Sequence, residues 1–431
     1  MMVQYPTNPD VIVIGAGAAG IGAGRALKQL RVPFIIVEAK DRVGGRAYSE
    51  TTSLGHLWDH GCHWFHSADV NVLREMADKL GHKYLPEPRR AYFNTFMDGS
   101  WSCRPLHDDY VWEKLAQVPE VGLAGKDIAA SEVIDPNHPW NPMVRHWLAL
   151  MYSADPEDIS TLDAGRYRDT GVNLPVEDGY GALVAKLARD LPIKLNTPVS
   201  AVSITKNGVE ITTSEGKIVA KSAVLAVPSR MIETGRIAFN PGLPGHLAQA
   251  FQDVPMGWYE KIALSFDRDV FAGFDPSYAD IFDPVAPTTQ PFNFELHPFG
   301  RPIAVTHLAG KHVRELERKG EAAMADFALE ALERAFGSDI RKRVVKSATT
   351  HWSSDPFING AYACAKPGRA DSRKVFLEPV HDRVFLAGEH VHQSFNATAH
   401  GAYLSGIDAA QAAAGKAGHG DHAADPLWLA A

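Results

Sequence analysis

The chain has 431 residues, of which 45% are apolar and 22% charged, as in ordinary soluble globular proteins. This length predicts one large α/β fold with an insertion, or two to three domains. The net charge of −8 does not fit the excess of basic residues that nucleic-acid-binding proteins have, and it slightly favours the binding of cationic small molecules. Three cysteines are too few for a disulfide framework or a CxxC metal site. Because a secretory signal and a long apolar run are also missing from the sequence, we expect a soluble, cytoplasmic protein.

The N-terminal segment 11–38 carries the strongest signal in the chain. A strand predicted at Val11–Ile14 is followed by the turn GAGAAG, a helix that extends to about residue 30, and a second strand at Phe34–Val37. Such a unit places a dinucleotide pyrophosphate at a helix N-terminus. Gly15 permits the tight turn, Gly17 lets backbone amides approach the phosphates, and Gly20 lets the helix pack closely on the strand. Glu38 stands where a carboxylate accepts both ribose hydroxyls, which disfavours NADP.

The segment 58–66 contains three histidines at a spacing of three residues, His60, His63 and His66. On one helix face, this spacing is compatible with a zinc site. However, Gly61 breaks a helix at this point, and no carboxylate pair completes the ligand set. The sequence therefore predicts no metal site.

The rest of the chain mixes helical and strand patterns, as an α/β protein does. Residues 67–175 are predicted to be mainly helical, and a Pro/Phe-rich stretch at 271–301 is given no element. Predicted helices lie at 70–80, 143–152, 181–190, 322–336 and 400–413. Predicted strands lie at Val199–Ile204, 208–213, 223–227, 261–266 and 303–308. The tail from residue 415 is predicted to be loosely ordered.

Arginines and paired glycines follow Glu38 in the motif DRVGGR at 41–46. Arg42 and Arg46 offer forked donors that match phosphate oxygens. Together with Glu38 and Ala39, the motif resembles the E-A-x-x-R-x-G-G-R block of the flavin-containing amine oxidase family. The resemblance recurs in RVFLAGE at 383–389 and TAHGAYLSG at 398–406. It implies a soluble, bacterial-type member that is similar to monoamine and polyamine oxidases and binds FAD.

The same resemblance implies an α/β fold with two domains. One is a Rossmann-like FAD-binding domain of the GR2 type, predicted to consist of residues 1–66, 176–255 and 350–431. The other is a discontinuous α+β substrate-binding domain, predicted to consist of residues 67–175 and 256–349. Because active sites commonly lie between domains, we expect the catalytic cavity where these two meet.

Three residues are implied to be catalytic: Lys261, His63 and Tyr362. In the family, a lysine in the context of Lys261 holds a water against flavin N5, and burial would lower its pKa. His63 matches a substrate-facing histidine, and His66 matches one at the cavity wall. Tyr362 matches one half of the aromatic pair that sandwiches the amine, and Thr398 stands at the other half, so the cage is half open. The alternatives left open are a surface lysine, a buried histidine bonded to the backbone and a plain core tyrosine.

Contacts to FAD are implied along the whole chain. Val199 matches a valine whose backbone meets the adenine, Trp352 belongs to an aromatic wall at the flavin, and Glu389 can accept a ribityl hydroxyl. Backbone amides that open the helix after Thr398 face the flavin pyrimidine. The full implied set is Gly15, Gly17, Ala19, Gly20, Glu38, Ala39, Arg42, Gly44, Gly45, Arg46, Gly61, His63, Val199, Trp352, Gly388, Glu389, Thr398 and Ala399. Ala361 stands where monoamine oxidases attach the flavin through a cysteine, so noncovalent FAD is expected.

The implied activity is that of an FAD-dependent amine oxidase. The neutral amine gives a hydride from its α-carbon to flavin N5, the imine hydrolyses to an aldehyde, and O₂ is reduced to hydrogen peroxide. The expected substrates are polyamine-like or other primary or secondary amines. No nucleic acid or membrane partner is expected, and a homodimer is left open.

Other activities on the same flavin scaffold are kept as alternatives. An L-amino-acid oxidase would use an arginine such as Arg166 or Arg168 to pair the substrate carboxylate. A desaturase or a protoporphyrinogen-oxidase-like enzyme is a further alternative. A non-catalytic FAD-bound partner-binding protein is disfavoured, because the sequence has no long helical insertion or basic segment.

Overall fold

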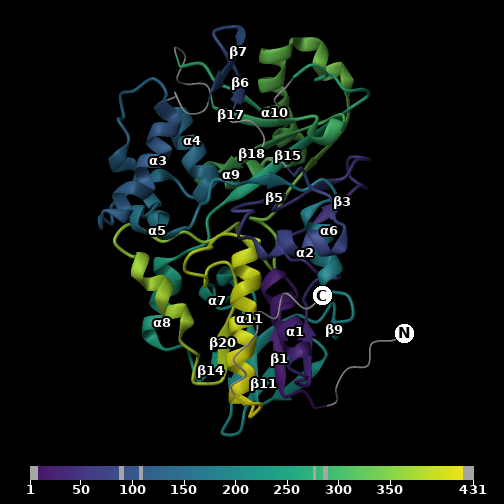
Figure 1. Ribbon diagram of the computed structural model, residues 1–431, viewed down its shortest axis with the longest axis vertical. Helices are drawn as coiled ribbons and strands as arrows, with labels where there is room; N and C mark the ends of the chain where they lie inside the picture. The colour runs from purple at the N-terminus through teal and green to yellow at the C-terminus, as the bar shows by residue number, and fades with distance from the viewer. Residues whose placement is uncertain (1–7, 87–91, 106–109, 275–277, 285–289, 421–431) are drawn as a thin grey trace.

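The computed structural model describes residues 8–86, 92–105, 110–274, 278–284 and 290–420. A five-stranded parallel sheet lies in the lower half of Figure 1, in the order β20-β13-β1-β2-β9. Its strands are β1 (Val11–Ile14), β2 (Phe34–Val37), β9 (Ile193–Lys194), β13 (Ser222–Leu225) and β20 (Val384–Leu386). All four pairings are parallel and in register.

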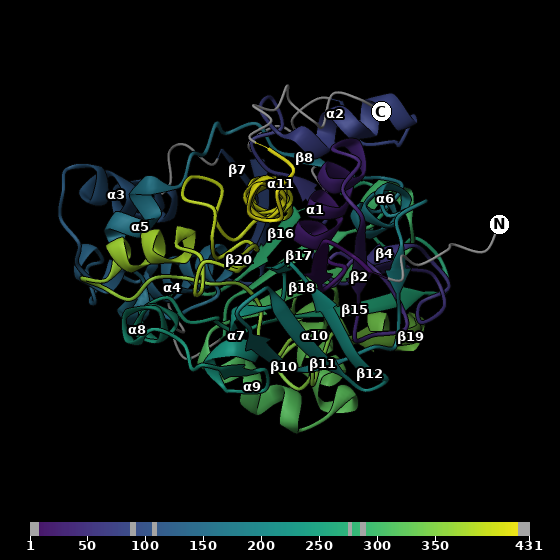
Figure 2. The same cartoon turned by 90° about the horizontal axis from the view of Figure 1, so that it is seen from below.

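Both faces of this sheet are covered. Val11 and Val13 belong to a core shared with helices α1 (Ala18–Gln29) and α11 (Ala399–Lys416), which Figure 2 shows side by side. Ile12 and Ile14 belong to a second core, which they share with a smaller mixed sheet. Burial on two faces explains why the strand sequences are continuous apolar runs rather than alternating ones.

The smaller sheet has four strands in the order β12-β11-β10-β14. They are β10 (Val199–Ile204), β11 (Val209–Thr213), β12 (Gly216–Ala220) and β14 (Ala238–Asn240). Helix α7 (Ser229–Glu233) precedes β14 in the chain, helix α8 (Gly245–Asp253) follows it, and both pack in the same core.

A seven-stranded mixed sheet lies in the upper half of Figure 1, in the order β19-β15-β18-β17-β16-β6-β7. Its strands are β6 (Tyr92–Met97), β7 (Ser100–Pro105), β15 (Tyr259–Phe266), β16 (Tyr278–Ile281), β17 (Phe292–Leu296), β18 (Ile303–Ala309) and β19 (Val344–Thr349). Ile262 and Leu264 of β15 pack with α10 (Glu321–Phe336) on one face. Side chains of the opposite face, Lys261 among them, therefore point to the site described below.

The remaining elements surround these sheets. The further α-helices are α2 (Val72–Leu80), α3 (Tyr110–Leu123), α4 (Asn141–Tyr152), α5 (Thr161–Arg166), α6 (Tyr180–Leu187) and α9 (Lys311–Arg318). Short strands are β3 (Ser49–Glu50), β4 (Trp58–Asp59), β5 (Trp64–Phe65) and β8 (Leu174–Pro175). Turns of 3₁₀ helix lie at Ala130–Val133, Pro156–Asp158, Pro298–Gly300, Ser338–Arg343 and Ala370–Leu377. Within the described ranges, no helix combines the length and apolarity needed to span a membrane.

The predicted α/β fold class is confirmed, and the predicted strands and helices are found close to their expected bounds. The parallel sheet takes strands from three separated parts of the chain, and the seven-stranded sheet takes its strands from the parts in between. Helix α2 belongs to the predicted substrate-binding domain, but it packs in one core with α1 and α11 of the predicted FAD-binding domain. The proposed domain bounds stay a prediction, and the end of the predicted tail lies outside the described residues.

Two predictions of local structure were incomplete. The segment 67–175 is not wholly helical, because it contains the hairpin β6–β7, whose turn residues Asp98 and Gly99 both have positive φ angles. An Asp-Gly pair between two strand-like runs is a strong hairpin signal, so the sequence did carry this information. The stretch 271–301 contains β16 and β17, two short strands that its prolines and phenylalanines conceal.

Candidate active site

The glycine-rich turn after β1 has the shape expected of a pyrophosphate cradle. Gly15 has φ +101°, and a Cβ there would lie 2.6 Å from the carbonyl oxygen of Ala226. Helix α1 begins after Gly17 with no side-chain cap and no acid in its first turn, so its first amides meet no competing anion. A Cβ built on Gly17 has Gly45 Cα as its nearest neighbour, at 3.9 Å. The residues present therefore fit a phosphate group held by backbone amides.

Glu38 is buried at the end of β2 beside this turn. Its carboxylate accepts the backbone N–H of Ala16 at 2.7 Å and that of Lys40 at 2.9 Å. A carboxylate offers about four acceptor positions, so two remain for ribose hydroxyls. Burial raises the pKa of Glu38, against the two backbone hydrogen bonds. The Thr197 N–H donates to the Glu38 carbonyl at 2.8 Å, which brings the strand that starts at Val199 close to this position.

The two motif blocks from opposite ends of the chain meet in the structure. Arg46 donates to the Glu389 carboxylate at 3.0 Å and to the carbonyl of Ala361. The other Glu389 oxygen accepts the N–H of Ala363 at 3.1 Å. A Cβ on Gly61 would lie 1.7 Å from the Arg46 carbonyl oxygen, so only glycine permits this approach.

Other members of the implied FAD set adjoin this region. Arg42 stacks on the Tyr48 ring at 3.9 Å and donates to the Gly45 carbonyl at 2.9 Å. Thr398 caps α11 by accepting the Gly401 N–H at 3.0 Å, and Ala399 is the first residue of that helix. The Trp352 indole donates to the carbonyl of His60 at 3.3 Å, next to Gly61.

Lys261 lies on β15 with only 2% of its surface exposed, so the surface-lysine alternative is wrong. Its ammonium donates to the backbone carbonyl of Asp59 and to Nδ1 of His63, both at 3.0 Å. Burial lowers the pKa of Lys261, against the charges of Glu295 and Asp59. Two of the three predicted catalytic residues are therefore in direct contact.

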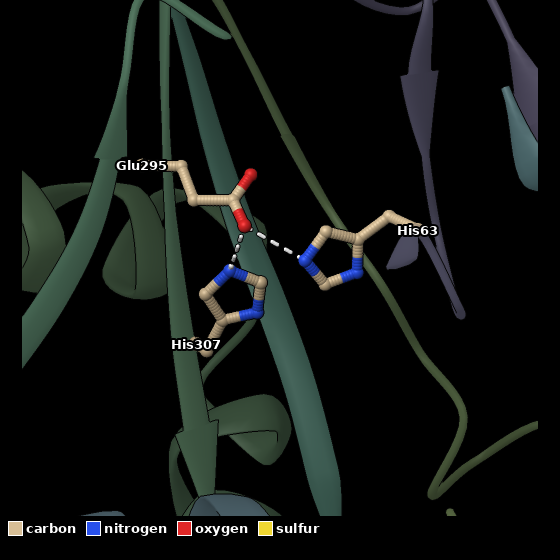
Figure 3. Close-up of side chains that lie close together, drawn as sticks. All are labelled: His63, Glu295 and His307. Atoms are coloured by element: carbon tan, nitrogen blue, oxygen red, sulfur yellow. Dashed lines mark hydrogen bonds and ion pairs between the residues drawn. The ribbon is translucent and has the colours of Figure 1, made fainter. Parts of the chain in front are cut away.

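Glu295 and His307 complete this cluster, and neither was predicted from the sequence. Figure 3 shows both histidine Nε2 atoms directed at one carboxylate oxygen of Glu295, at 2.7 Å from His63 and 3.7 Å from His307. The indole of Trp64 donates to the same oxygen at 3.3 Å. The two imidazole rings stack with centroids 5.2 Å apart and planes 13° apart.

Strand register brings these side chains to one face of the seven-stranded sheet. Lys261 of β15 lies opposite His307 of β18, and Val305, two residues before His307, lies opposite Glu295 of β17. Side chains two residues apart on a strand share a face, so all three point the same way. The run Phe292–Leu296 alternates buried phenylalanine and leucine with polar residues, a pattern that indicated which face Glu295 occupies.

The cluster combines one cation, one anion and two imidazoles. Burial lowers the pKa of His63, helped by the Lys261 charge, and lowers the pKa of His307 to about 4. Burial acts to raise the pKa of Glu295, but the interactions with His63 and His307 outweigh it and hold this pKa well below the usual range. Glu295 is therefore the anionic centre of the site.

A pocket opens against this face. Its walls include Asp59, His63, Lys261, Glu295 and Arg301. The Arg301 guanidinium donates to the backbone carbonyl of Glu177 at 2.6 Å. The pocket therefore presents an ammonium, a carboxylate and an imidazole to a small molecule.

Tyr362 lies beside this cluster and close to the predicted flavin region. Its ring is 5.9 Å from that of Tyr259, and its hydroxyl donates to the carbonyl of Leu150. Tyr259 in turn contacts Nδ1 of His307 at 2.7 Å through its hydroxyl. The predicted catalytic residues thus share one region of the structure.

The three histidines of 58–66 do not converge, because each has a different partner. His60 contacts Glu50 at 3.2 Å, His66 contacts Asn173 at 2.8 Å, and His63 contacts Glu295. Arg166, named above for an amino-acid substrate, instead pairs with Asp371 at 2.7 Å near the surface.

Comparison with known proteins places this geometry in a family. A family model described as flavin containing amine oxidoreductase matches residues 18–167 and 146–414. The chain is 28% identical to polyamine oxidase 4 of Oryza sativa subsp. japonica, over 94% of this chain and 89% of that protein. It is 26% identical to lysine-specific histone demethylase 2 of Homo sapiens, over 93% of this chain and 53% of that protein.

A solved structure of a putrescine oxidase double mutant has a similar fold, with a TM-score of 0.77 and 18% identity. The similarity covers 94% of this chain and 98% of that one. The family model spans most of the chain and includes both motif blocks that meet at Arg46 and Glu389. The chain therefore belongs to the flavin-containing amine oxidoreductase family of enzymes.

Proposed function

We propose that this protein is an amine oxidase with noncovalent FAD that acts on polyamine-like or other primary or secondary amines. The products would be an imine, which hydrolyses to an aldehyde, and hydrogen peroxide from O₂. The observation that carries the proposal is the buried Lys261, hydrogen-bonded to His63 and facing a pocket that also contains Glu295. The names of the polyamine oxidase and putrescine oxidase relatives support this substrate class.

The cofactor proposal assigns separate regions to the parts of FAD. The turn at Gly15–Gly17 and the start of α1 would hold the pyrophosphate, and Glu38 would hold the ribose. Arg46 and Glu389 would lie along the ribityl chain. Ala361 has no thiol, which supports noncovalent attachment. Bound FAD would supply the two-electron acceptor that amino-acid side chains lack.

The protein's own residues would bind, orient and desolvate the amine. The described residues accept two of the three N–H donors of Lys261, at Asp59 and His63, so one donor remains for a water or ligand in the pocket. The carboxylate of Glu295 would attract a cationic amine into the pocket. Apolar walls of the pocket, Pro175, Val176 and Tyr278 among them, would limit the orientation of its carbon chain.

One observation supports a second candidate, an L-amino-acid oxidase. Arg301 lines the pocket, and an arginine there can pair with a substrate carboxylate. Against it, Arg301 is already bonded to the Glu177 carbonyl, and Glu295 would repel a carboxylate in the same pocket. We therefore place this candidate second.

Anaerobic bleaching of the flavin tests both candidates. The holoenzyme is mixed without oxygen with diamines, polyamines, arylalkylamines and α-amino acids, and peroxide is then measured in air. Bleaching by amines with peroxide release is the expected result. Bleaching by α-amino acids alone, lost in Arg301→Gln, would support the second candidate. Absence of bleaching by the whole panel would overturn both.

A further inference from the structure

Three side chains from distant parts of the chain, two of which line the pocket, converge with the ligand types of a transition-metal site. His63 comes from the segment 58–66, Glu295 from β17 and His307 from β18 (Figure 3). One ligand atom from each, an imidazole nitrogen or a carboxylate oxygen, lies within 4.8 Å of the other two. We propose that His63, Glu295 and His307 form a binding site for a divalent cation of the zinc class.

The ligand set selects the kind of metal. Two imidazole nitrogens and one carboxylate oxygen suit Zn²⁺, whereas Mg²⁺ and Ca²⁺ prefer oxygen ligands alone. Both Nε2 atoms point at the same Glu295 oxygen, so a small outward rotation of this carboxylate would place a cation between the three groups.

The outer nitrogens of both imidazoles are positioned as metal-bound histidines require. Nδ1 of His63 lies 3.3 Å from the carbonyl oxygen of Gly61, and Nδ1 of His307 lies 2.7 Å from the Tyr259 hydroxyl. An N–H at Nδ1 that is donated to such an oxygen fixes the ring orientation and leaves Nε2 as the ligand atom. For His63, this tautomer gives up the hydrogen bond that Lys261 donates to Nδ1. The His307 side chain is 5% exposed and that of His63 is 23% exposed, so burial favours the neutral rings that bind metal.

The charges around the cluster predict how strongly it binds. Glu295 supplies one negative charge, but the Lys261 ammonium lies 3.0 Å from Nδ1 of His63, on the other side of that ring. This ammonium opposes a dication, so the site should bind Zn²⁺ more tightly when Lys261 is replaced by methionine.

Occupation of the site would compete with the amine. Three protein ligands leave a fourth position of a tetrahedral ion open, and His63 and Glu295 line the pocket, so that position faces the bound substrate. The ion would neutralise the Glu295 carboxylate that attracts a cationic amine into the pocket, so the metal and the amine would exclude each other. Zn²⁺ would therefore act as an inhibitor whose effect falls as the amine concentration rises.

Equilibrium dialysis of the holoenzyme with Zn²⁺, followed by metal analysis, tests the site without reference to turnover. We expect about one Zn²⁺ per chain that is not displaced by excess Mg²⁺. Glu295→Gln and His307→Gln should each weaken this binding by about 100-fold or more, since even partners of metal ligands contribute 10- to 100-fold. Flavin content and near-ultraviolet circular dichroism of each variant establish that it is folded.

A matched control is available on the surface. His351 lies between Glu317 and Glu321, at 3.6 and 2.9 Å, and thus offers an imidazole beside carboxylates outside the pocket. His351→Gln should leave the stoichiometric Zn²⁺ in place, and Lys261→Met should bind it more tightly. Absence of stoichiometric Zn²⁺ binding would overturn the proposal. Wild-type Zn²⁺ affinity in both folded variants, Glu295→Gln and His307→Gln, would also overturn it, as would loss of the metal in His351→Gln. Zn²⁺ binding without amine turnover would refute only the proposed function.

Discussion

Replacing Lys261 with methionine is expected to slow flavin reduction, flavin reoxidation or both, while the flavin stays bound. The side chain has three N–H donors, and the described residues accept two of them, the Asp59 carbonyl and His63 Nδ1, each at 3.0 Å. The third can donate to a water or substrate atom, and a hydrogen bond of this charged kind is worth about 1.5–3 kcal/mol. Because about 1.4 kcal/mol corresponds to a factor of ten, the affected step should slow by about 10- to 150-fold.

Stopped-flow measurement of each half-reaction decides which step depends on Lys261. Anaerobic mixing with amine gives the rate of flavin reduction, and mixing the reduced enzyme with O₂ gives the rate of reoxidation. Methionine nearly matches the lysine stem in volume, so packing should be retained. Lys346→Met is the control, because Lys346 is exposed on the neighbouring β19. Wild-type rates for both half-reactions of Lys261→Met would show that our placement of the active site is wrong.

Three further predictions concern the cofactor and stability. Glu38→Ala should weaken FAD binding by about 10- to 150-fold, because a hydrogen bond to a charged acceptor is worth about 1.5–3 kcal/mol. The variant should regain activity with excess FAD, and an unchanged FAD affinity would show that the ribose is held elsewhere. Acid precipitation should release FAD into the supernatant, because Ala361 offers no thiol, and flavin retained in the pellet would contradict this. The carboxylates of Glu317 and Glu321 raise the pKa of His351 from 6.5 to about 9. The contribution of His351 to the free energy of unfolding should therefore be complete below about pH 6.5 and lost as pH rises through about 9. Solvent screening limits this contribution to about 1 kcal/mol. In denaturant unfolding, His351→Gln should have a lower free energy of unfolding than the wild type, and this difference should shrink as pH rises; a difference that grows would contradict the prediction.

The parts of the fold that could be predicted are those with local signals. The strand, glycine turn and helix at 11–30 form a contiguous pattern, and the structure reproduces it with β1 and α1. The hairpin β6–β7 was missed because the segment around it is mainly helical, although the Asp98-Gly99 pair is typical of a hairpin turn. The strands β16 and β17 have only four and five residues, so the short alternation in β17 was overlooked among the flanking prolines.

The candidate site was predicted only where a single residue sits in a recognisable context. Lys261 and His63 were chosen separately, and the structure places their side chains in contact. Glu295 and His307 join them through the pairing of β15, β18 and β17. This pairing brings together residues that are far apart in the chain, such as Tyr259 and His307, which are 48 positions apart. Register between strands is set by non-local packing, so no local pattern specifies these contacts.

Neighbouring residues of β15 show how a buried charge with a structural role differs from one available for chemistry. Glu260 and Lys261 are 0% and 2% exposed and point to opposite faces of the sheet. Glu260 accepts four hydrogen bonds, from the Thr350 hydroxyl, the Trp352 N–H, and the N–H and hydroxyl of Ser353. Its capacity as an acceptor is thereby filled, and it fixes the turn that carries Trp352.

Lys261 is satisfied only in part, by one carbonyl oxygen and one imidazole nitrogen, and neither acceptor is a carboxylate. Burying an ammonium without a direct ion pair costs free energy, and a purely structural position would favour an apolar residue of similar volume. Departures of this kind from the rules of packing concentrate at functional sites. The incomplete hydrogen bonding of Lys261, more than its burial, is therefore the physical reason to place the reacting centre at this end of β15.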